Sequence, residues 1–459
     1  MRGNRAGHSP ASRSLRLVAL SFTVTFMCLG QVERERSDFP FQRQAISYEA
    51  ISLVGDDSSR ALVDVHYRIR QDFFIFIRND SPKRGAEYIA RGELVVELQD
   101  DQKVSIAREI RQIVLERSTI PRENEPSPDL EGAFSFRVPG GTYSVIISLD
   151  DRESGRTFLE RNRRVVAAVP THKPLEISGA FFVLPETAGP AEGDVVPLNQ
   201  AGNVLYGGTG GLITELFLPD TVSGLRVHWH LRGQSDVFGR LTQDFSDSTV
   251  LSAAGLLGLD MRGGKILYST KPSSLPWRTC YVPLPIEKLE PGSFRLEIEY
   301  SLGRIKQTQE HQFRVIWPFR PVSLSDPDLA VEVLRHIATD QQVHDMHSGS
   351  AEHRAHAFYQ FWRAKDPDTT TAYNEVMAEY YYRVDEAMRK FSTIGEGDGY
   401  KTDRGRVYIL YGPPEQTDRL LQPGSAPTEV WTYGRIKKRF VFIDPNKSGA
   451  FILSQTENL

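Results

Sequence analysis

The chain has 459 residues, 40% of them apolar and 25% charged, with a formal net charge of −4 at pH 7. That length supplies material for about three domains of roughly 150 residues each, held together by hydrophobic cores. The negative net charge argues against a nucleic-acid-binding protein, because such proteins present a basic face.

Residues 1–30 are typical of a secretory signal peptide. Four arginines come first, and no acidic residue precedes Glu33. An uncharged apolar stretch then covers residues 17–29. It is too short to span a bilayer, which takes roughly 20 apolar residues, but it suits the apolar region of a signal. The sequence therefore predicts an exported protein, periplasmic or extracellular, that is cleaved after Gly30.

Two other interpretations of this segment are less favoured. A lipoprotein attached through Cys28 would need small residues before the cysteine, and residues 25–27 are Thr, Phe and Met. An organellar transit peptide would not contain an uninterrupted apolar block. Cleavage would remove four arginines, which gives −4 − 4 = −8 for the mature chain and leaves Cys280 as its one cysteine. An intramolecular disulfide and a cysteine zinc cluster are thereby excluded, and no later segment is apolar enough to be a transmembrane span.

Residues 46–169 predict a first β-sandwich module. Within residues 61–69, polar side chains alternate with apolar ones from Asp64 onward, which predicts a half-buried strand. Residues 73–77 are all apolar and suit a core strand. The Pro-Gly-Gly at 139–141 separates two alternating segments and predicts a hairpin, and residues 150–155 predict the next turn. Several short strands at this spacing are typical of an immunoglobulin-like sandwich.

Residues 175–318 predict a second β-sandwich module. One face of a predicted strand carries Leu225, Val227, Trp229 and Leu231, and the other carries Arg226, His228, His230 and Arg232. Trp229 is therefore expected to be buried. The two histidines are expected to face solvent, between arginines whose charges oppose a bound cation.

Residues 319–459 predict an α+β domain, because the apolar period changes from two to 3.6 after Trp317. Residues 325–328 have the types of a helix start, and a second helix is predicted over 351–365. The strongest helix covers residues 373–391, where the apolar side chains form one stripe. Strands are then predicted at 407–411, 429–433, 439–444 and 450–454. Helices followed by a small antiparallel sheet make an α+β domain.

Several distinctive segments follow one another in this region. They are FWRAKDP at 361–367, EYYYR at 379–383, GYKTDRGRVYILYGPP at 399–414, EVW at 429–431 and FVFID at 440–444. Together they resemble the bacterial GWxTD domain. The resemblance covers roughly the last hundred residues and is specific, because the motifs occur in order. Tyr400 stands where the naming tryptophan would be. The resemblance implies an exported bacterial protein, often with β modules ahead of the domain, and implies no established activity.

The motif residues of this resemblance have no assigned role. They are Trp362, Asp366, Gly399, Tyr400, Thr402, Asp403, Arg404 and Gly405. By residue type, 402–405 predict a turn that feeds the strand at 407–411, in which Asp403 bonds backbone N–H groups and Gly405 takes a positive φ. The Gly-Pro-Pro at 412–414 would end that strand. The alternative is a binding cleft built around the same loop.

No catalytic site, metal site or cofactor is predicted. Two histidine pairs, His344 with His347 and His353 with His356, have the spacing at which imidazoles on a helix share a metal. However, HExxH is absent, and residues 348–350 separate the pairs. The glycine-rich 207–211 lacks the GK[ST] ending of a phosphate loop and precedes a strand-like run, which favours a hairpin loop. No nucleophile elbow or reactive-cysteine motif is present.

The leading hypothesis is a non-catalytic exported protein. Its two sandwiches would serve spacing or recognition, and its C-terminal domain would bind a protein partner in the cell envelope. The alternative is a hydrolase or a metal-dependent enzyme with its site near Asp403, Arg404 or the histidine pairs. A third possibility, glycan or peptide binding on a sandwich face, would need exposed aromatic side chains such as Trp229 or Trp277.

Overall fold

The computed structural model describes residues 45–55, 59–82, 85–119, 128–186, 193–219, 224–238, 241–393, 397–422 and 424–459. The predicted signal peptide, including Cys28, lies outside these residues. Residues 45–459 form one compact unit. In the part of the chain that the structure describes, no helix is long and apolar enough to cross a bilayer.

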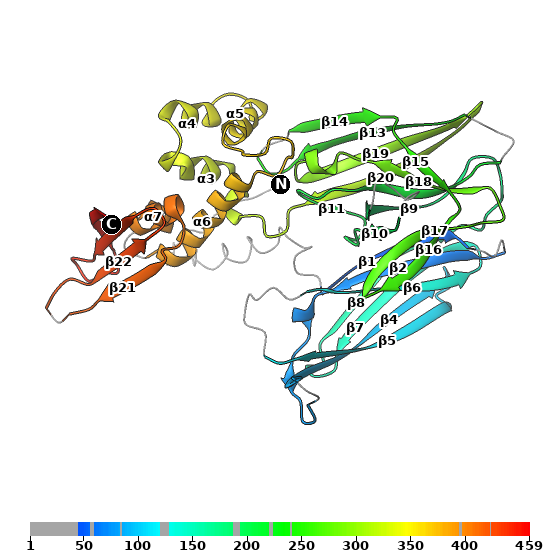
Figure 1. Cartoon of the computed structure of the whole chain (residues 1–459), viewed down its shortest axis with the longest axis horizontal. Helices are drawn as coiled ribbons and strands as arrows, with labels where there is room; N and C mark the ends of the chain where they lie inside the picture. Colours follow the sequence, from blue (N-terminus) through cyan, green and yellow to red (C-terminus); the bar gives the residue numbers. More distant parts are fainter. Residues whose placement is uncertain are drawn as a thin grey trace, which may run out of the picture. The chain divides into compact units, whose positions relative to one another are not determined.

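The first β region forms two antiparallel sheets around one core (Figure 1). One sheet has the order β1-β2-β6, with β1 at Ile46–Val54, β2 at Ala61–Ile69 and β6 at Leu130–Val138. The other contains β3 (Ile77–Arg78), β4 (Tyr88–Gln99), β7 (Gly141–Asp151) and β8 (Thr157–Ala167) in that order, and β5 (Ser105–Arg117) pairs with β4. Alternating apolar side chains from both sheets fill the space between them, as the period-two pattern predicts.

The hairpin predicted at Pro139 and Gly140 is wrong. β6 pairs with β2, whereas β7 pairs with β4 and β8, so this turn carries the chain from one sheet to the other. Local residue types predicted the turn but not the partners of the two strands, which are set by distant segments. The turn at 150–155 does join the paired strands β7 and β8.

Two predictions about burial in this region are also wrong. Residues 73–77 are not a core strand: a short 3-10 helix (η1, Gln71–Phe73) ends at Phe73, and Ile75 and Ile77 are exposed. β2 is not half-buried, because Asp64 and His66 on its polar face are both 0% exposed. A tyrosine about two hundred residues later in the chain, Tyr268 of β17 (Lys265–Lys271), covers this face.

The second β region also forms two sheets. The first has the order β15-β18-β12-β9-β10-β17-β16, made of β9 (Glu176–Pro185), β10 (Val195–Pro197), β12 (Gly211–Phe217), β15 (Leu251–Ala254), β16 (Leu256–Arg262), β17 and β18 (Trp277–Pro283). The second has the order β11-β20-β19-β13-β14, made of β11 (Val204–Leu205), β13 (Leu225–Ser235), β14 (Thr242–Asp247), β19 (Gly292–Leu302) and β20 (Ile305–Ile316). A 3-10 turn, η2 (Ile286–Lys288), precedes β19.

Side-chain burial in β13 confirms the pattern predicted for it. Trp229 is buried, while His228 is exposed and His230 is partly exposed and bonded to Asp244. The glycine-rich 207–211 does lead into a strand, β12. It is not a hairpin loop, because β11 and β12 belong to different sheets.

Helices dominate the next segment. They are η3 (Val322–Leu324), α3 (Pro327–Glu332), η4 (Val333–His336), α4 (Asp340–His347), α5 (Ala351–Arg363), α6 (Glu375–Phe391), η5 (Gly399–Lys401) and α7 (Asp403–Tyr411). Asp326 caps α3 by accepting the N–H groups of Asp328 and Leu329, as its residue type predicts. The predicted stripe of α6 is confirmed from Met377 onward, since Tyr381 and Val384 are completely buried, but Val376 is 42% exposed and the helix begins at 375 instead of 373.

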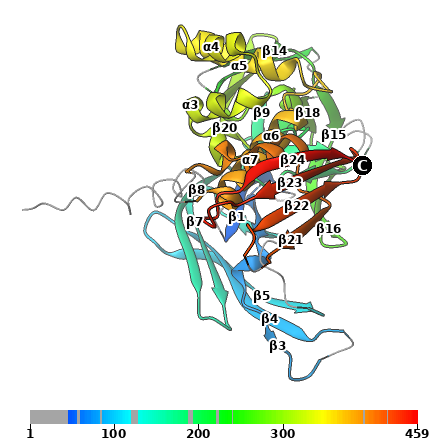
Figure 2. The ribbon, with the colours of Figure 1, turned by 90° about the vertical axis from the view of Figure 1, so that its left-hand side faces the viewer.

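The strand predicted at 407–411 is wrong, because these residues form α7. Thr402 caps this helix with its hydroxyl, and Gly412, with φ 80°, ends it. The antiparallel sheet that follows is confirmed, with β21 (Gln416–Leu420), β22 (Thr428–Tyr433), β23 (Lys438–Ile443) and β24 (Ile452–Asn458) in sequence order beside α7 (Figure 2). One continuous hydrophobic core joins the second β region to these helices and this sheet.

Candidate functional site

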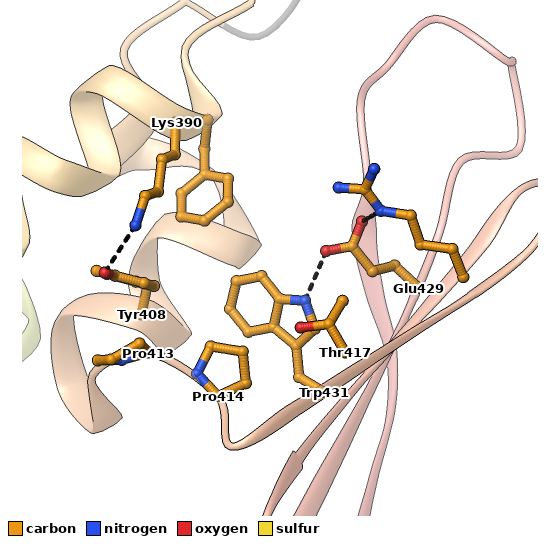
Figure 3. A pocket seen from close by; sticks show the side chains of 9 residues that line it. Lys390, Tyr408, Pro413, Pro414, Thr417, Glu429 and Trp431 are labelled. Carbon is orange, nitrogen blue, oxygen red and sulfur yellow. Dashed lines mark hydrogen bonds and ion pairs between the residues drawn. The ribbon is translucent and has the colours of Figure 1, made fainter. Parts of the chain in front are cut away.

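An open groove lies between the C-terminal end of α6, α7 and the first two strands of the last sheet (Figure 3). Its volume is about 530 Å³, which is within the range of ligand sites. It is lined by Lys390, Phe391, Tyr408, Pro413, Pro414, Thr417, Arg419, Glu429 and Trp431.

The floor of the groove is aromatic and rigid. Trp431 packs against Phe391 with ring centroids 5.5 Å apart, and Phe391 packs edge-on against Tyr408 at 5.7 Å. Pro413 and Pro414, which follow the glycine that ends α7, form an apolar wall beside Trp431 (Figure 3). The three rings are only 2–7% exposed, so an apolar side chain of a ligand would mainly meet the exposed Pro413 and the partly exposed Pro414.

A buried carboxylate organises one side of the groove. Glu429 is 4% exposed and accepts the indole N–H of Trp431 at 2.6 Å. Its other oxygen lies 3.2 Å from Nε of Arg419 and 3.7 Å from Nη1 of Arg404. A charge this deeply buried is tolerated only when it is paired and hydrogen-bonded. Glu429 is therefore committed to holding the indole and the two guanidinium groups in place.

Two cations lie at the edges of the groove. The Arg419 side chain is 69% exposed, although its Nε is bound to Glu429. Lys390 donates to the hydroxyl of Tyr408 at 3.0 Å and pairs with Glu386 at 2.8 Å. Both cations are paired with glutamates, but the exposed Arg419 guanidinium lies beside the apolar floor and has further N–H donors for an acidic group of a ligand.

Most of the motif residues form the support behind this groove. The hydroxyl of Thr402 accepts the N–H of Gly405 at 2.9 Å and donates to the carbonyl of Gly399 at 2.8 Å. A Cβ on Gly405 would lie 1.9 Å from the carbonyl oxygen of Gly399, and one on Gly399 would lie 2.1 Å from that of Ala387. Close backbone approach, and not a positive φ, therefore requires glycine at position 405, contrary to the prediction of a turn.

Asp403 and Arg404 connect α7 to the sheet. Asp403 accepts the backbone N–H of Leu453 in β24 at 2.8 Å. The Arg404 guanidinium donates to the carbonyl of Gly449 and lies over the rings of Phe451 and Phe391 at 4.2 and 5.3 Å. Because Arg404 contacts both Phe391 and Glu429, a motif residue directly supports the groove.

Tyr400 and Trp362 are both buried. Tyr400 is 1% exposed, and its hydroxyl bonds Lys401 and Glu332 at the protein surface. Trp362 packs in α5 against Tyr380 and Tyr381 of α6 at 5.5 and 5.6 Å. Both therefore hold helices in position.

Asp366 lies just after α5 and accepts the N–H of Asp368. Its charge acts on Glu290, whose pKa is raised to about 8, first by burial and then by Asp366. The motif residues thus form two groups. Those at 399–405 lie behind the groove, whereas Trp362 lies in the last turn of α5 and Asp366 lies just after that helix.

The histidine pairs do not converge on a metal site. His344 and His347 lie on α4, His353 and His356 on α5, and His356 is next to Gln360. Among the described residues, no group of three or more His, Cys, Asp and Glu side chains could hold a metal ion. Cys280 is buried, and burial raises the pKa of its thiol to about 12, which keeps it unreactive at neutral pH.

A cluster of buried polar groups lies between the two β regions, where sequence reasoning placed solvent. The Tyr268 hydroxyl donates to Asp64 at 2.6 Å and lies 2.6 Å from Nε2 of His66. Glu215 accepts the N–H groups of Val54 and Leu257, both at 2.8 Å. Asp64, His66 and Glu215 are each 0% exposed, so they join the two regions and do not meet a ligand from solvent.

Sequence reasoning also missed Lys390, Thr417 and Arg419 as groove residues. Thr417 and Arg419 lie on β21, a strand with no alternating apolar pattern, and all of its residues are exposed. The sequence did contain one indication of the groove. Glu429 and Trp431 are two residues apart, so both side chains lie on the same face of a strand.

No curated protein matches the chain. The family model of the GWxTD domain matches residues 301–453, a range that contains every motif residue and every residue that lines the groove. This match confirms the resemblance inferred from the separated motifs. The last third of the chain, from the end of β19 into β24, is a GWxTD domain.

Proposed function

We propose that this chain is an exported, non-catalytic interaction protein whose GWxTD groove binds a polypeptide segment of a partner in the cell envelope. The observation that carries the proposal is the groove itself, with an apolar floor of prolines and aromatic rings and a largely exposed arginine, Arg419, at its edge. Export rests on the composition of residues 1–30. The two β regions, read as immunoglobulin-like sandwiches, serve as spacers or recognition surfaces.

The expected ligand is a short segment with an apolar or aromatic side chain followed by an acidic one. The apolar side chain would lie on Pro413 and Pro414, where burial of apolar area favours binding. The acidic group would pair with Arg419, since a guanidinium has five N–H donors and the contact with Glu429 uses its Nε.

The test uses substitutions instead of a truncation, because the core is continuous from the second β region into the GWxTD domain. Mature protein (residues 31–459) is immobilised, exposed to envelope extract and crosslinked. The variants are Arg419→Gln and, as the matched control, Arg439→Gln, which also removes a strand arginine paired with a glutamate. We expect Arg419→Gln to weaken capture of a specific partner about tenfold, which corresponds to 1.4 kcal/mol, and the control to bind normally.

Equal capture by both variants would show that the groove is not the binding site. If no protein is captured specifically by the unaltered chain, the interaction role itself fails. A partner that is captured should then be mapped with synthetic peptides, and peptides without an acidic residue should bind more weakly.

A further inference from the structure

The edge strand β5 has an exposed face with an unusual composition. Its burial alternates so that the even-numbered residues from 106 to 116 are all exposed. Three of them are β-branched and apolar, namely Ile106, Ile110 and Val114, with exposures of 38%, 51% and 58%. Among the described residues, β5 pairs with β4 only, so its second edge carries unpaired backbone groups.

Edge strands of soluble proteins are normally protected against pairing with another chain. The usual devices are a short length, proline, charged side chains or a bulge in the strand. β5 has 13 residues and contains no proline, glycine or lysine, and the one irregularity in its pairing with β4 is near its start, beside Gln99. Its charged residues are of both signs, Arg108, Glu109, Arg111, Glu116 and Arg117, so they disfavour some pairing registers and favour others. Such an edge is a template for the addition of a further strand.

The inner face of β5 is fixed within its own chain. Arg111 donates to the hydroxyl of Tyr67 at 2.6 Å and to the carbonyl of Ala133 at 3.0 Å, and it lies over the ring of Phe134. Ile113 is buried in the core. The strand is therefore presented in a defined position, with its exposed face fixed.

The exposed face is complementary to itself. When two copies of β5 pair antiparallel about a twofold axis through Gln112, Arg108 of each lies opposite Glu116 of the other. In the same register Ile110 lies opposite Val114. Axes at residues 110, 111 or 113 instead place Arg108 opposite glutamine, valine or serine. Opposite charges and β-branched pairs directly across strands both stabilise antiparallel pairing.

We infer that the protein forms a twofold homodimer by antiparallel pairing of β5 with β5, centred on Gln112. Each interface then contains two Arg108–Glu116 pairs and two Ile110–Val114 pairs, as a closed twofold contact requires. Pairing also satisfies the backbone groups of the edge and closes it against further addition. This surface is separate from the GWxTD groove, so the inference does not depend on the proposed function.

The test is the oligomeric state of the protein from residue 31 onward, measured by sedimentation velocity over a range of concentrations. We expect a dimer that Arg108→Glu or Glu116→Arg each weakens more than tenfold. The double variant, which restores opposite charges, should recover the dimer. Arg304→Glu, an exposed arginine in the turn between β19 and β20, is the matched control and should not change it.

The position of the axis has its own test. Gln112→Cys should form a disulfide-linked dimer on mild oxidation, because the two residues lie opposite each other and Cys280 is buried. Val114→Cys should not, since the two copies of residue 114 would be roughly 14 Å apart along the strand direction. A protein that stays monomeric, or a dimer that is insensitive to all the 108 and 116 substitutions, would overturn the inference.

Discussion

The indole N–H of Trp431 donates a 2.6 Å hydrogen bond to the carboxylate of Glu429, two residues earlier on the same face of β22. The carboxylate is 4% exposed and faces Arg404 and Arg419, so one acidic group fixes both the floor and one edge of the groove. The shape of the groove therefore depends on an ion pair whose members differ strongly in exposure.

Glu429→Ala should destabilise the GWxTD domain by about 3–5 kcal/mol, because it removes the carboxylate that pairs with the buried Arg404 charge and accepts the indole N–H. Arg419→Ala should cost less than about 1 kcal/mol, since its side chain is 69% exposed. Urea unfolding followed by tryptophan fluorescence measures both. Equal losses for the two variants would contradict the assignment of Glu429 as the buried centre of the network.

Gly405→Ala should destabilise the protein although alanine favours helices. Its Cβ would lie 1.9 Å from the carbonyl oxygen of Gly399, and a backbone atom can move only if η5 moves away from α7. The expected loss is about 1–3 kcal/mol, as for overpacking of a well-packed site. Arg406→Ala, an exposed residue next to it in the same helix, is the control and should change stability by less than about 0.5 kcal/mol. An unchanged melting temperature for Gly405→Ala would show that η5 can shift to accommodate the added Cβ without loss of stability.

Sequence reasoning succeeded where a periodic pattern faces one neighbouring surface. The stripe of α6 and the two faces of β13 follow directly from helical and strand geometry. It failed where the deciding contact is distant in the chain. Asp64 and His66 look like solvent-facing residues of β2, yet a tyrosine on β17 covers them.

The segment 407–411 shows a conflict between local preference and its surroundings. Its residues, Val-Tyr-Ile-Leu-Tyr, favour a strand, but Thr402 caps a helix at one end and Gly412 ends it at the other. The groove could be predicted only in part for a similar reason. Glu429 and Trp431 share a face by spacing, but their neighbours Lys390 and Phe391 come from a helix about forty residues earlier, and spacing does not place that helix.

Tyr400 allows the role of its ring to be separated from that of its hydroxyl. Tyr400→Phe should cost about 1 kcal/mol, because it removes the hydroxyl that bonds Lys401 and Glu332 near the surface. Tyr400→Ala should cost about 3–5 kcal/mol, because it empties a site where the ring is 1% exposed. Thermal unfolding of the two variants measures the difference. If Tyr400→Phe proved as damaging as Tyr400→Ala, the hydroxyl and not the ring would be the essential part.

Glu290 should make stability depend on pH at the junction of the second β region and the helices. Burial, and then the charge of Asp366, raises its pKa to about 8, while the Tyr206 hydroxyl opposes the shift. The folded protein therefore keeps this proton to a higher pH than the unfolded chain. The contribution of Glu290 to stability is complete below the ordinary pKa of 4.5 and is lost as pH rises towards 8.

The Glu290→Gln variant cannot ionise at this position. From pH 5 to 8 the melting temperature of the unaltered protein should therefore fall relative to that of the variant. Glu287→Gln is the control for the same chemical change nearby. If the melting temperatures of Glu290→Gln and the unaltered protein changed with pH in parallel, the pKa of Glu290 would not be raised. If the unaltered protein instead became less stable than the variant as pH fell, the pKa would be lowered by folding.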